Sequence, residues 1–233
     1  MSISSRFKVY DFSENIFVIE IKNENEYPDQ VQAHLSLSEH LRSGYYWVEV
    51  AAGEKSIFVT YNCLEISALK ALEIIHNQLE EFIYKEESDQ NLELVIPVYY
   101  SEESGLDIQD VAATHNLSIQ EIAHLHSQPT YKVKMIGFTP GFAYIGDLPK
   151  ELFMSRLSKP RVNLLAGSVG ITGNRTCIYP LGGPGGWRII GRTPLTLFHK
   201  DKKNPFGILP GINIRFKPMT KQEYENFKQD NPL

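Results

Sequence analysis

Residues 166–173 read Ala-Gly-Ser-Val-Gly-Ile-Thr-Gly, with a glycine at every third position among small and apolar side chains. They lie in residues 137–194, a stretch of 58 residues that holds 11 of the 16 glycines and 6 of the 13 prolines. Long regular elements do not persist there, because glycine adds backbone freedom and proline removes an amide donor. Short strands at Ser168–Thr172 and Trp187–Gly191 fit between the turns. The pattern predicts a β-barrel or β-sandwich with elaborate loops.

Shorter regular elements flank this stretch on both sides. The periodicity predicts strands at 92–100, 131–136 and 208–216, helices at 107–115 and 118–126, and a polar tail at 221–229. Ser118 and Glu121 form a capping-box pattern at the start of the second helix. Pro97 lies inside the first strand, which favours an edge or strand-end position because proline lacks a donor for the sheet.

The first part of the chain indicates a small mixed domain. Its expected elements are strands at 9–12, 16–21, 46–50 and 57–61, a helix at 31–41 and a longer helix after Asn62. Asn62 is the expected N-cap of that helix, with Glu65 three residues later. Its apolar face is expected to comprise Ile66, Leu69, Leu72, Ile75, Leu79 and Phe82. The polar run at 85–91 sets a predicted boundary between domains 1–90 and 91–233.

Composition narrows the class of protein. The chain has 233 residues, of which 42% are hydrophobic and 22% charged, and a net charge of -5. A core of useful size is therefore expected, and a general nucleic-acid binder, which carries a positive field, is disfavoured. Cys63 and Cys177 lie too far apart to suggest a zinc cluster or a disulfide framework. No apolar run reaches about 18 residues and no secretory leader is visible, so no membrane partner and a cytoplasmic location are expected.

The charge is distributed unevenly along the chain. Residues 137–194 carry seven Lys and Arg side chains against Asp147 and Glu151, a sum of +5, so the rest of the chain carries -10. Arginine in glycine-rich turns predicts binding of a small anion or of an acidic partner surface. The alternative is that these arginines are solubilising surface charges or brace loops. The charge and the glycines together predict a cationic, glycine-rich concave region.

No complete catalytic set is visible in the sequence. The glycine-rich stretch contains no histidine and no GxxxxGK[ST] phosphate loop. His124 and His126 diverge by about 200° on a helix, so they predict no shared metal. Ser168 has no assignable Asp–His pair, and a loop hydroxyl bonded to the backbone is the alternative to a functional role. Cys177 lies in an apolar run and is expected to pack rather than react.

Three blocks of residues resemble a known family. Residues 137–146 read GFTPGFAYIG, residues 160–180 contain PR, AGSVGITG and IYP, and residues 184–194 read PGGWRIIGRTP. They resemble the B subunit of the bacterial ATP-dependent 5-oxoprolinase. This family includes the KipI inhibitor of a sporulation histidine kinase and the subunit 1 domain of allophanate hydrolase and urea carboxylase proteins. Arg175 stands where the family usually has glutamine and adds a positive charge at that position.

The resemblance implies an α+β protein with a small α/β N-terminal domain, residues 1–90, and a cyclophilin-like β-barrel domain, residues 91–233. It implies a hydrolase that is inactive alone. With the homologous C subunit and the A subunit of 5-oxoprolinase, it would convert 5-oxo-L-proline, a small carboxylate, to L-glutamate while the complex uses ATP. ATP need not bind to this chain. The catalytic residues stay unassigned, and no metal is expected.

The resemblance also directs attention to a set of substrate-binding candidates. Phe138, Phe142, Tyr144 and Trp187 either wall a pocket or fill the barrel, and the sequence leaves both alternatives open. The expected substrate-binding residues are Arg161, Ser168, Arg192, Gly141, Phe142, Tyr144 and Trp187.

Two other functions follow from the same family resemblance. A KipI-like chain would bind a sensor histidine kinase and block its autophosphorylation. A carboxyltransferase-like component, or a part of an allophanate hydrolase, would act on a urea-type or biotin-linked substrate. The chain has no Met-Lys-Met biotin-attachment site, so biotin would come from another protein.

Overall fold

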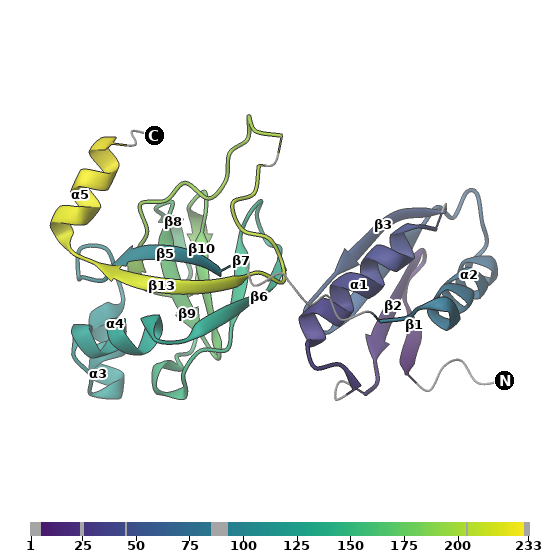
Figure 1. The fold of residues 1–233 in the computed structure, drawn as a ribbon, viewed down its shortest axis with the longest axis horizontal. Helices are drawn as coiled ribbons and strands as arrows, with labels where there is room; N and C mark the ends of the chain where they lie inside the picture. Colours follow the sequence, from purple (N-terminus) through teal and green to yellow (C-terminus); the bar gives the residue numbers. More distant parts are fainter. Residues whose placement is uncertain (1–5, 24–25, 45, 85–92, 204, 231–233) are drawn as a thin grey trace. The chain divides into compact units, whose positions relative to one another are not determined.

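The computed structural model describes residues 6–23, 26–44, 46–84, 93–203 and 205–230. Contacts divide the chain into two compact units, residues 1–89 and 90–233 (Figure 1). Each unit has its own hydrophobic core. The polar run at 85–91, on which the predicted domain boundary depends, lies outside the described residues.

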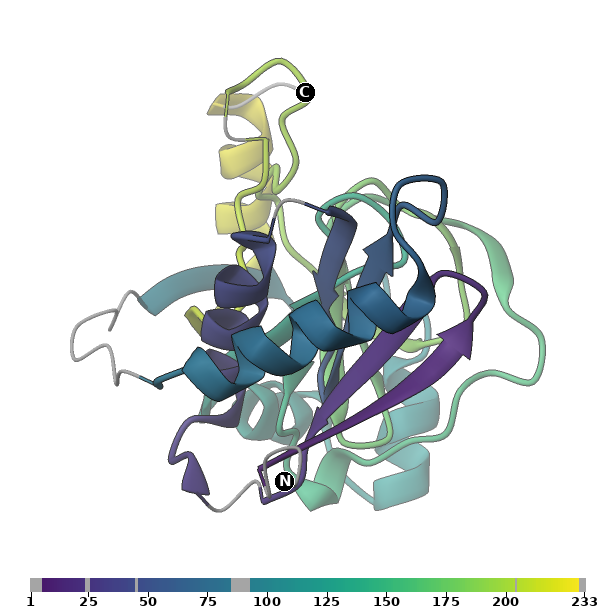
Figure 2. The same cartoon turned by 90° about the vertical axis from the view of Figure 1, so that its right-hand side faces the viewer.

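The first unit is an antiparallel sheet with two helices on one face (Figure 1, Figure 2). Its strands, in spatial order, are β1 (Phe7–Ser13), β2 (Ile16–Ile21), β4 (Ser56–Tyr61) and β3 (Trp47–Ala52), and its helices are α1 (Gln30–Arg42) and α2 (Ala68–Glu81). Alternate residues of the strands and one face of each helix meet in the core. The predicted strands and helices of this unit are therefore present.

Helix α2 begins later than the sequence predicted. Its N-cap is Ser67, whose side chain accepts a hydrogen bond from the Lys70 amide. Asn62 instead closes a turn, because its side-chain oxygen accepts from the Leu64 amide at 3.1 Å. Leu69, assigned to the apolar face, is 81% exposed. The correction reflects competition between an Asx turn and a helix cap, which use the same side-chain oxygen.

The second unit is a closed barrel of seven strands (Figure 1). Around the barrel, these are β10 (Arg175–Tyr179), β7 (Ala143–Gly146), β6 (Thr130–Ile136), β13 (Asn213–Met219), β5 (Glu93–Tyr99), β12 (Arg188–Arg192) and β9 (Ser168–Thr172). Two further strands, β8 (Arg161–Leu164) and β11 (Gly183–Gly185), pair with each other, and the helices of this unit are α3 (Ile108–His115), α4 (Ile119–Ser127), α5 (Lys221–Asp230) and the short 3₁₀ helix Lys150–Leu152. The α+β class and the barrel are confirmed.

Strand β5 differs from its predicted place at an edge. It lies inside the closed barrel, parallel to β13 over its whole length. On its other side it pairs with β12 only where Tyr99 meets Arg192. Pro97 therefore interrupts no pair with β12. Proline is tolerated in this interior strand because one of its two ladders is almost open.

The end of the chain also requires two corrections. The last strand begins at Asn213 rather than at Ile208. The predicted polar tail is helix α5, which starts after a reciprocal cap: the Thr220 amide donates to Glu223 at 2.7 Å, and the Glu223 amide donates to the Thr220 hydroxyl at 3.3 Å. This T-x-x-E pattern is a helix-start signal that the sequence contains and that the predicted tail overlooked.

Within the described part of the chain, every helix is too short or too polar to cross a lipid bilayer.

Candidate functional site

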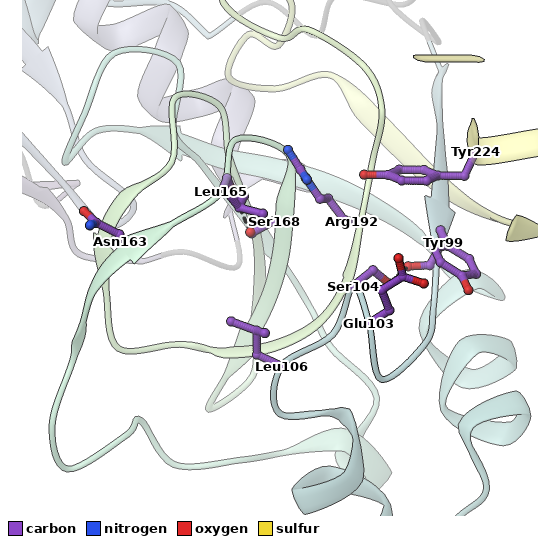
Figure 3. A pocket seen from close by; sticks show the side chains of 9 residues that line it. All are labelled: Tyr99, Glu103, Ser104, Leu106, Asn163, Leu165, Ser168, Arg192 and Tyr224. Atoms are coloured by element: carbon purple, nitrogen blue, oxygen red, sulfur yellow. Dashed lines mark hydrogen bonds between the residues drawn. The ribbon is translucent and has the colours of Figure 1, made fainter. Parts of the chain in front are cut away.

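A cavity of about 210 Å³ lies in the barrel unit where β5 and β12 end and β9 begins (Figure 3). Its lining combines one guanidinium, one carboxylate, one amide, several hydroxyl groups and two leucines. The lining residues are Tyr99, Glu103, Ser104, Leu106, Asn163, Leu165, Ser168, Arg192 and Tyr224. We call this cavity the Arg192 pocket. Drug-sized ligands usually occupy roughly 300–1,000 Å³, so this one suits a smaller molecule.

Strand register brings the central residues of the pocket together. Arg192 on β12 lies opposite Ser168 on β9 and also opposite Tyr99 on β5. The adjacent residues Val169 and Val98 belong to the barrel core. Because successive side chains of a strand point to opposite faces, the three-residue row faces away from the barrel interior. The pocket is therefore built on the outer surface of the barrel wall.

Arg192 is the residue best placed to hold an anion. Its Nε atom donates to the carbonyl oxygen of Ala166 at 2.7 Å, which fixes the direction of the guanidinium. Within the described residues no carboxylate pairs with it. The turn that carries Ala166 packs closely against the segment after Arg192, and this requires glycine at position 167. The φ of Gly167 is +82°, and a Cβ there would collide with the carbonyl oxygen of Thr193. The outer edge of the guanidinium is thus available for a bidentate contact to a carboxylate.

Ser168 lies beside Arg192 but is held by the backbone. Its hydroxyl donates to the Leu165 carbonyl at 2.7 Å, and the residue is buried. None of its hydrogen bonds within the described chain involves a histidine or a carboxylate. The geometry therefore matches the alternative of a loop hydroxyl bonded to the backbone. The oxygen can still accept a hydrogen bond from a ligand, so a binding role stays a prediction.

Arg161 lies outside the Arg192 pocket, in a buried ion pair. Its two terminal nitrogens donate to the two oxygens of Asp107, both at 2.8 Å. The Asp107 side chain is 1% exposed and also accepts from the Ile189 amide at 2.8 Å. This arrangement joins β8, the start of α3 and β12. The structure therefore does not bring Arg161 and Arg192, two of the predicted substrate-binding residues, into one cavity.

Other arginines of the basic stretch are also paired. Arg188 lies 3.1 Å from Asp110, and Arg175 lies 2.8 Å from Asp147. Asp147 also meets Lys134 at 3.1 Å, and its pKa is lowered by these hydrogen bonds and charges although desolvation raises it. Asp107 and Asp110, which lie outside residues 137–194, therefore offset two of the five net positive charges, and Asp147 is already counted in that sum.

The glycine-rich aromatics form a separate cluster. Phe142 and Trp187 are buried, and the ring of Phe142 lies 4.9 Å from that of Tyr144 and 5.0 Å from that of Tyr179. The cluster also contains Leu164 of β8, so it fills the space between the barrel wall and the β8–β11 pair. These rings fill the structure and line no part of the Arg192 pocket.

Two neighbours of that cluster have different surroundings. Phe138 is 63% exposed, and the centroid of its ring lies 5.4 Å from that of Phe142. Gly141 has a φ of +77°, which explains a glycine at this turn. Cys177 is buried among these rings, and burial raises the pKa of its thiol, as expected of a packing residue.

Several residues of the pocket were not predicted from the sequence. Tyr99 was predicted only as part of the strand at 92–100, and Tyr224 was assigned to a polar tail. Their rings lie 5.4 Å apart. Glu103 pairs with Lys221 at 2.8 Å. The missed signal for Tyr224 was the cap at Thr220, which begins the helix that carries it.

A buried polar network crosses the barrel core. His126 contacts the Tyr100 hydroxyl through Nδ1 at 2.7 Å and the Thr176 hydroxyl through Nε2 at 2.8 Å. Since Thr176 donates onward to Gly170, it accepts from Nε2, so Tyr100 donates to Nδ1. Burial lowers the pKa of His126 to about 3, so the imidazole stays neutral. His124 lies on the surface.

The described residues contain no cluster of His, Cys, Asp or Glu side chains with the spacing of a metal site.

Comparison with known proteins gives consistent results. Residues 7–208 match the family described as the carboxyltransferase domain, subdomain C and D. The chain is 41% identical to the B subunit of 5-oxoprolinase from Escherichia coli O157:H7 over 171 residues, which are 73% of this chain and 78% of that protein. It is 34% identical to the B subunit of 5-oxoprolinase from Bacillus subtilis strain 168 over 178 residues, covering 75% and 74%.

A solved structure shares the fold. The crystal structure of the protein TTHA0988 superposes with a TM-score of 0.74 and 26% identity, over 88% of this chain. This chain spans 40% of the length of that protein.

Proposed function

The chain belongs to the family of the carboxyltransferase domain, subdomain C and D, and from this membership and its 5-oxoprolinase relatives we propose that it is the B subunit of an ATP-dependent 5-oxoprolinase. The complex would hydrolyse the cyclic amide of 5-oxo-L-proline to give L-glutamate. The observation that carries this proposal is the 41% identity to a 5-oxoprolinase B subunit over 73% of the chain.

The Arg192 pocket supplies a site for the carboxylate of that substrate. The guanidinium has a fixed direction through its bond to Ala166 and no carboxylate partner among the described residues. A bidentate contact to a ligand carboxylate would use its outer N–H groups, and Ser168 could accept or share a further hydrogen bond. The substrate amide would then point toward the open side of the pocket.

A partner protein would complete the site from that open side. Large exposed apolar side chains surround the pocket: Leu106 and Leu165 line it, and Val162 and Leu181 lie on adjoining segments. Clustered apolar exposure of this kind marks protein–protein contacts. We therefore propose that the C and A subunits of 5-oxoprolinase bind here and that this chain is inactive alone. Within the described chain no general base contacts Ser168, which supports this dependence.

ATP would be used by the complex and need not bind to this chain. The sequence has no GxxxxGK[ST] loop, and the Arg192 pocket offers a single guanidinium in about 210 Å³. A triphosphate usually needs several donors and a metal ion. These features support a division in which this chain holds the carboxylate while a partner supplies the phosphoryl chemistry.

Reconstitution tests the proposal. The purified chain is mixed with its C and A partner subunits, and ATP hydrolysis is measured with and without 5-oxo-L-proline. We expect substrate-dependent hydrolysis and glutamate formation only when this chain is present. Equal activity in a mixture that omits the chain would refute the proposal. A cognate sensor kinase, added with this chain alone in a separate assay, tests the KipI-like alternative through its autophosphorylation.

A further inference from the structure

We propose that helix α5 determines which carboxylates the Arg192 pocket accepts, because Tyr224 and Tyr99 form an aromatic wall of that pocket. This inference rests on the proposed function and assigns to α5 a role in substrate selection. The wall would receive the flat five-membered ring of the substrate while Arg192 holds its carboxylate. Bulkier rings would then meet Tyr224.

The wall is well defined in the structure. Tyr224 is 7% exposed and lines the pocket together with Arg192 and Tyr99. The two tyrosine rings lie 5.4 Å apart with an angle of 32° between their planes. In Figure 3 the phenol ring of Tyr224 extends into the pocket with its hydroxyl toward Arg192. A ligand bound to that guanidinium would therefore lie beside the tyrosine rings.

Three features place α5 at this position. Parallel pairing puts Met219, the last residue of β13, opposite Tyr99, the last residue of β5. The helix begins directly after this pair, at the Thr220 cap. Lys221 on its first turn then pairs with Glu103, which lines the same pocket, at 2.8 Å. The start of the helix is thus fixed to the pocket from two sides.

Beyond its first turn, part of α5 is separated from the strands by a cavity. A second cavity of about 330 Å³ lies between the helix and the strands, lined by Pro97, Lys217, Pro218, Met219, Glu223, Asn226 and Phe227. Tyr224 is the buried side chain of the helix among those whose burial is described. Removing its ring therefore enlarges the Arg192 pocket without removing a large part of the barrel core.

Helix α5 also lies beyond the residues that match the family. The match ends at residue 208, whereas the helix spans Lys221–Asp230. The pocket therefore combines strand residues from the matched region, Ser168 and Arg192, with a wall residue from outside it. With this arrangement Arg192 and Ser168 would bind the carboxylate of any substrate, and Tyr224 would limit the size of the substrate ring.

Kinetics of the reconstituted complex test the role of the wall. Tyr224→Ala should raise the KM for 5-oxo-L-proline about tenfold and change kcat less than twofold, because the ring contact is lost while the reacting groups are untouched. It should also narrow the preference for 5-oxoproline over its six-membered homologue, 6-oxopiperidine-2-carboxylate, by about tenfold. Tyr224→Phe keeps the ring and should retain most of the wild-type selectivity. Gln222→Ala, an exposed change on the same helix, serves as the matched control.

The outcomes separate this inference from the proposed function. If the wild-type complex shows no 5-oxoproline-dependent activity, the proposed function fails, and ligand-detected NMR then measures 5-oxoproline binding to the same complex. Weaker binding to the Tyr224→Ala complex than to the Gln222→Ala complex would still support the wall. Unchanged KM, selectivity and binding in Tyr224→Ala, with an unchanged melting temperature, would overturn it. If Tyr224→Ala does not fold, loss of selectivity on replacement by leucine decides the question, and retained selectivity refutes the inference.

Discussion

Arg161 and Arg192 carry the same guanidinium, belong to the same basic stretch and have opposite surroundings in the barrel unit. Arg161 donates both terminal nitrogens to Asp107, which is almost fully buried. Arg192 uses Nε for the Ala166 carbonyl and directs the rest of its guanidinium to a cavity. The contacts of the first stabilise the fold, and those of the second fit the binding role that we propose for it. The difference is that Arg161 has a carboxylate partner, whereas Arg192 has none among the described residues.

The largest expected effect comes from breaking the buried pair. Asp107→Ala leaves the Arg161 guanidinium without its carboxylate and removes the acceptor of the Ile189 amide. Loss of one partner of a buried pair costs about 3–5 kcal/mol. We expect urea denaturation to show a decrease of that size in the free energy of unfolding. Arg161→Ala should decrease it less, because Asp107 then keeps the Ile189 amide at 2.8 Å and the Arg188 guanidinium at 3.9 Å.

An exposed pair provides the control for this comparison. Arg215 lies 2.8 Å from Glu93 on the barrel surface, at the same distance as the buried pair. Exposed pairs contribute little to stability because water and salt screen them. Arg215→Ala should therefore leave the urea midpoint nearly unchanged. Equal effects of Arg161→Ala and Arg215→Ala would contradict the assignment of Arg161 to the fold.

Lowering the pH should decrease the free energy of unfolding through His126, which is buried in the barrel core. In the unfolded chain His126 takes up a proton near pH 6.5, whereas in the folded chain its pKa is about 3. The unfolded state therefore binds more protons between these values, so stability is complete above pH 6.5 and falls as the pH is lowered toward 3. By about pH 4.5 protonation of this group in the unfolded chain should remove roughly 3 kcal/mol of stability, since each pH unit contributes about 1.4 kcal/mol.

Paired denaturation curves check the acid effect. The free energy of unfolding is measured at pH 7 and pH 4.5 for the wild type and for His126→Gln, which does not titrate. We expect the wild type to lose more stability between the two pH values than the variant loses. His124→Gln, a change at an exposed histidine two residues away, should retain the wild-type pH dependence. Identical pH dependence in the wild type and His126→Gln would show that the buried imidazole does not carry the effect.

Most helices and strands of the barrel unit could be predicted from the sequence. The strand at Ser168–Thr172 and the capping box at Ser118 were predictable because strand alternation and capping involve neighbouring residues. The same capping pattern was present at Thr220, so helix α5 was within reach of the sequence and was missed. Local signals therefore account for most of the elements.

The residues that line the Arg192 pocket are brought together by contacts between distant parts of the sequence, which no local sequence pattern reveals. Asp107 lies 54 positions before Arg161, so their pairing follows only from barrel closure. Tyr224 reaches the pocket because β13 runs parallel to β5 and ends beside Tyr99. The seven predicted binding residues share family blocks, yet the structure brings only Ser168 and Arg192 into the Arg192 pocket. The sequence could identify the basic stretch, and only the fold separated paired from unpaired arginines.

At Arg192 the change in stability should be small and the change in function large. Arg192→Ala removes one part-buried hydrogen bond to Ala166 and should lower the free energy of unfolding by about 1 kcal/mol. In the reconstituted complex it should remove about 1.5–3 kcal/mol of charge-assisted bonding to the substrate carboxylate, which is roughly a 10- to 150-fold loss in kcat/KM. Arg192→Lys keeps the charge but not the two parallel bonds, so it should restore only part of that loss. A matched fall in melting temperature and activity would place Arg192 with Arg161, among residues that serve the fold, and would remove the distinction between them.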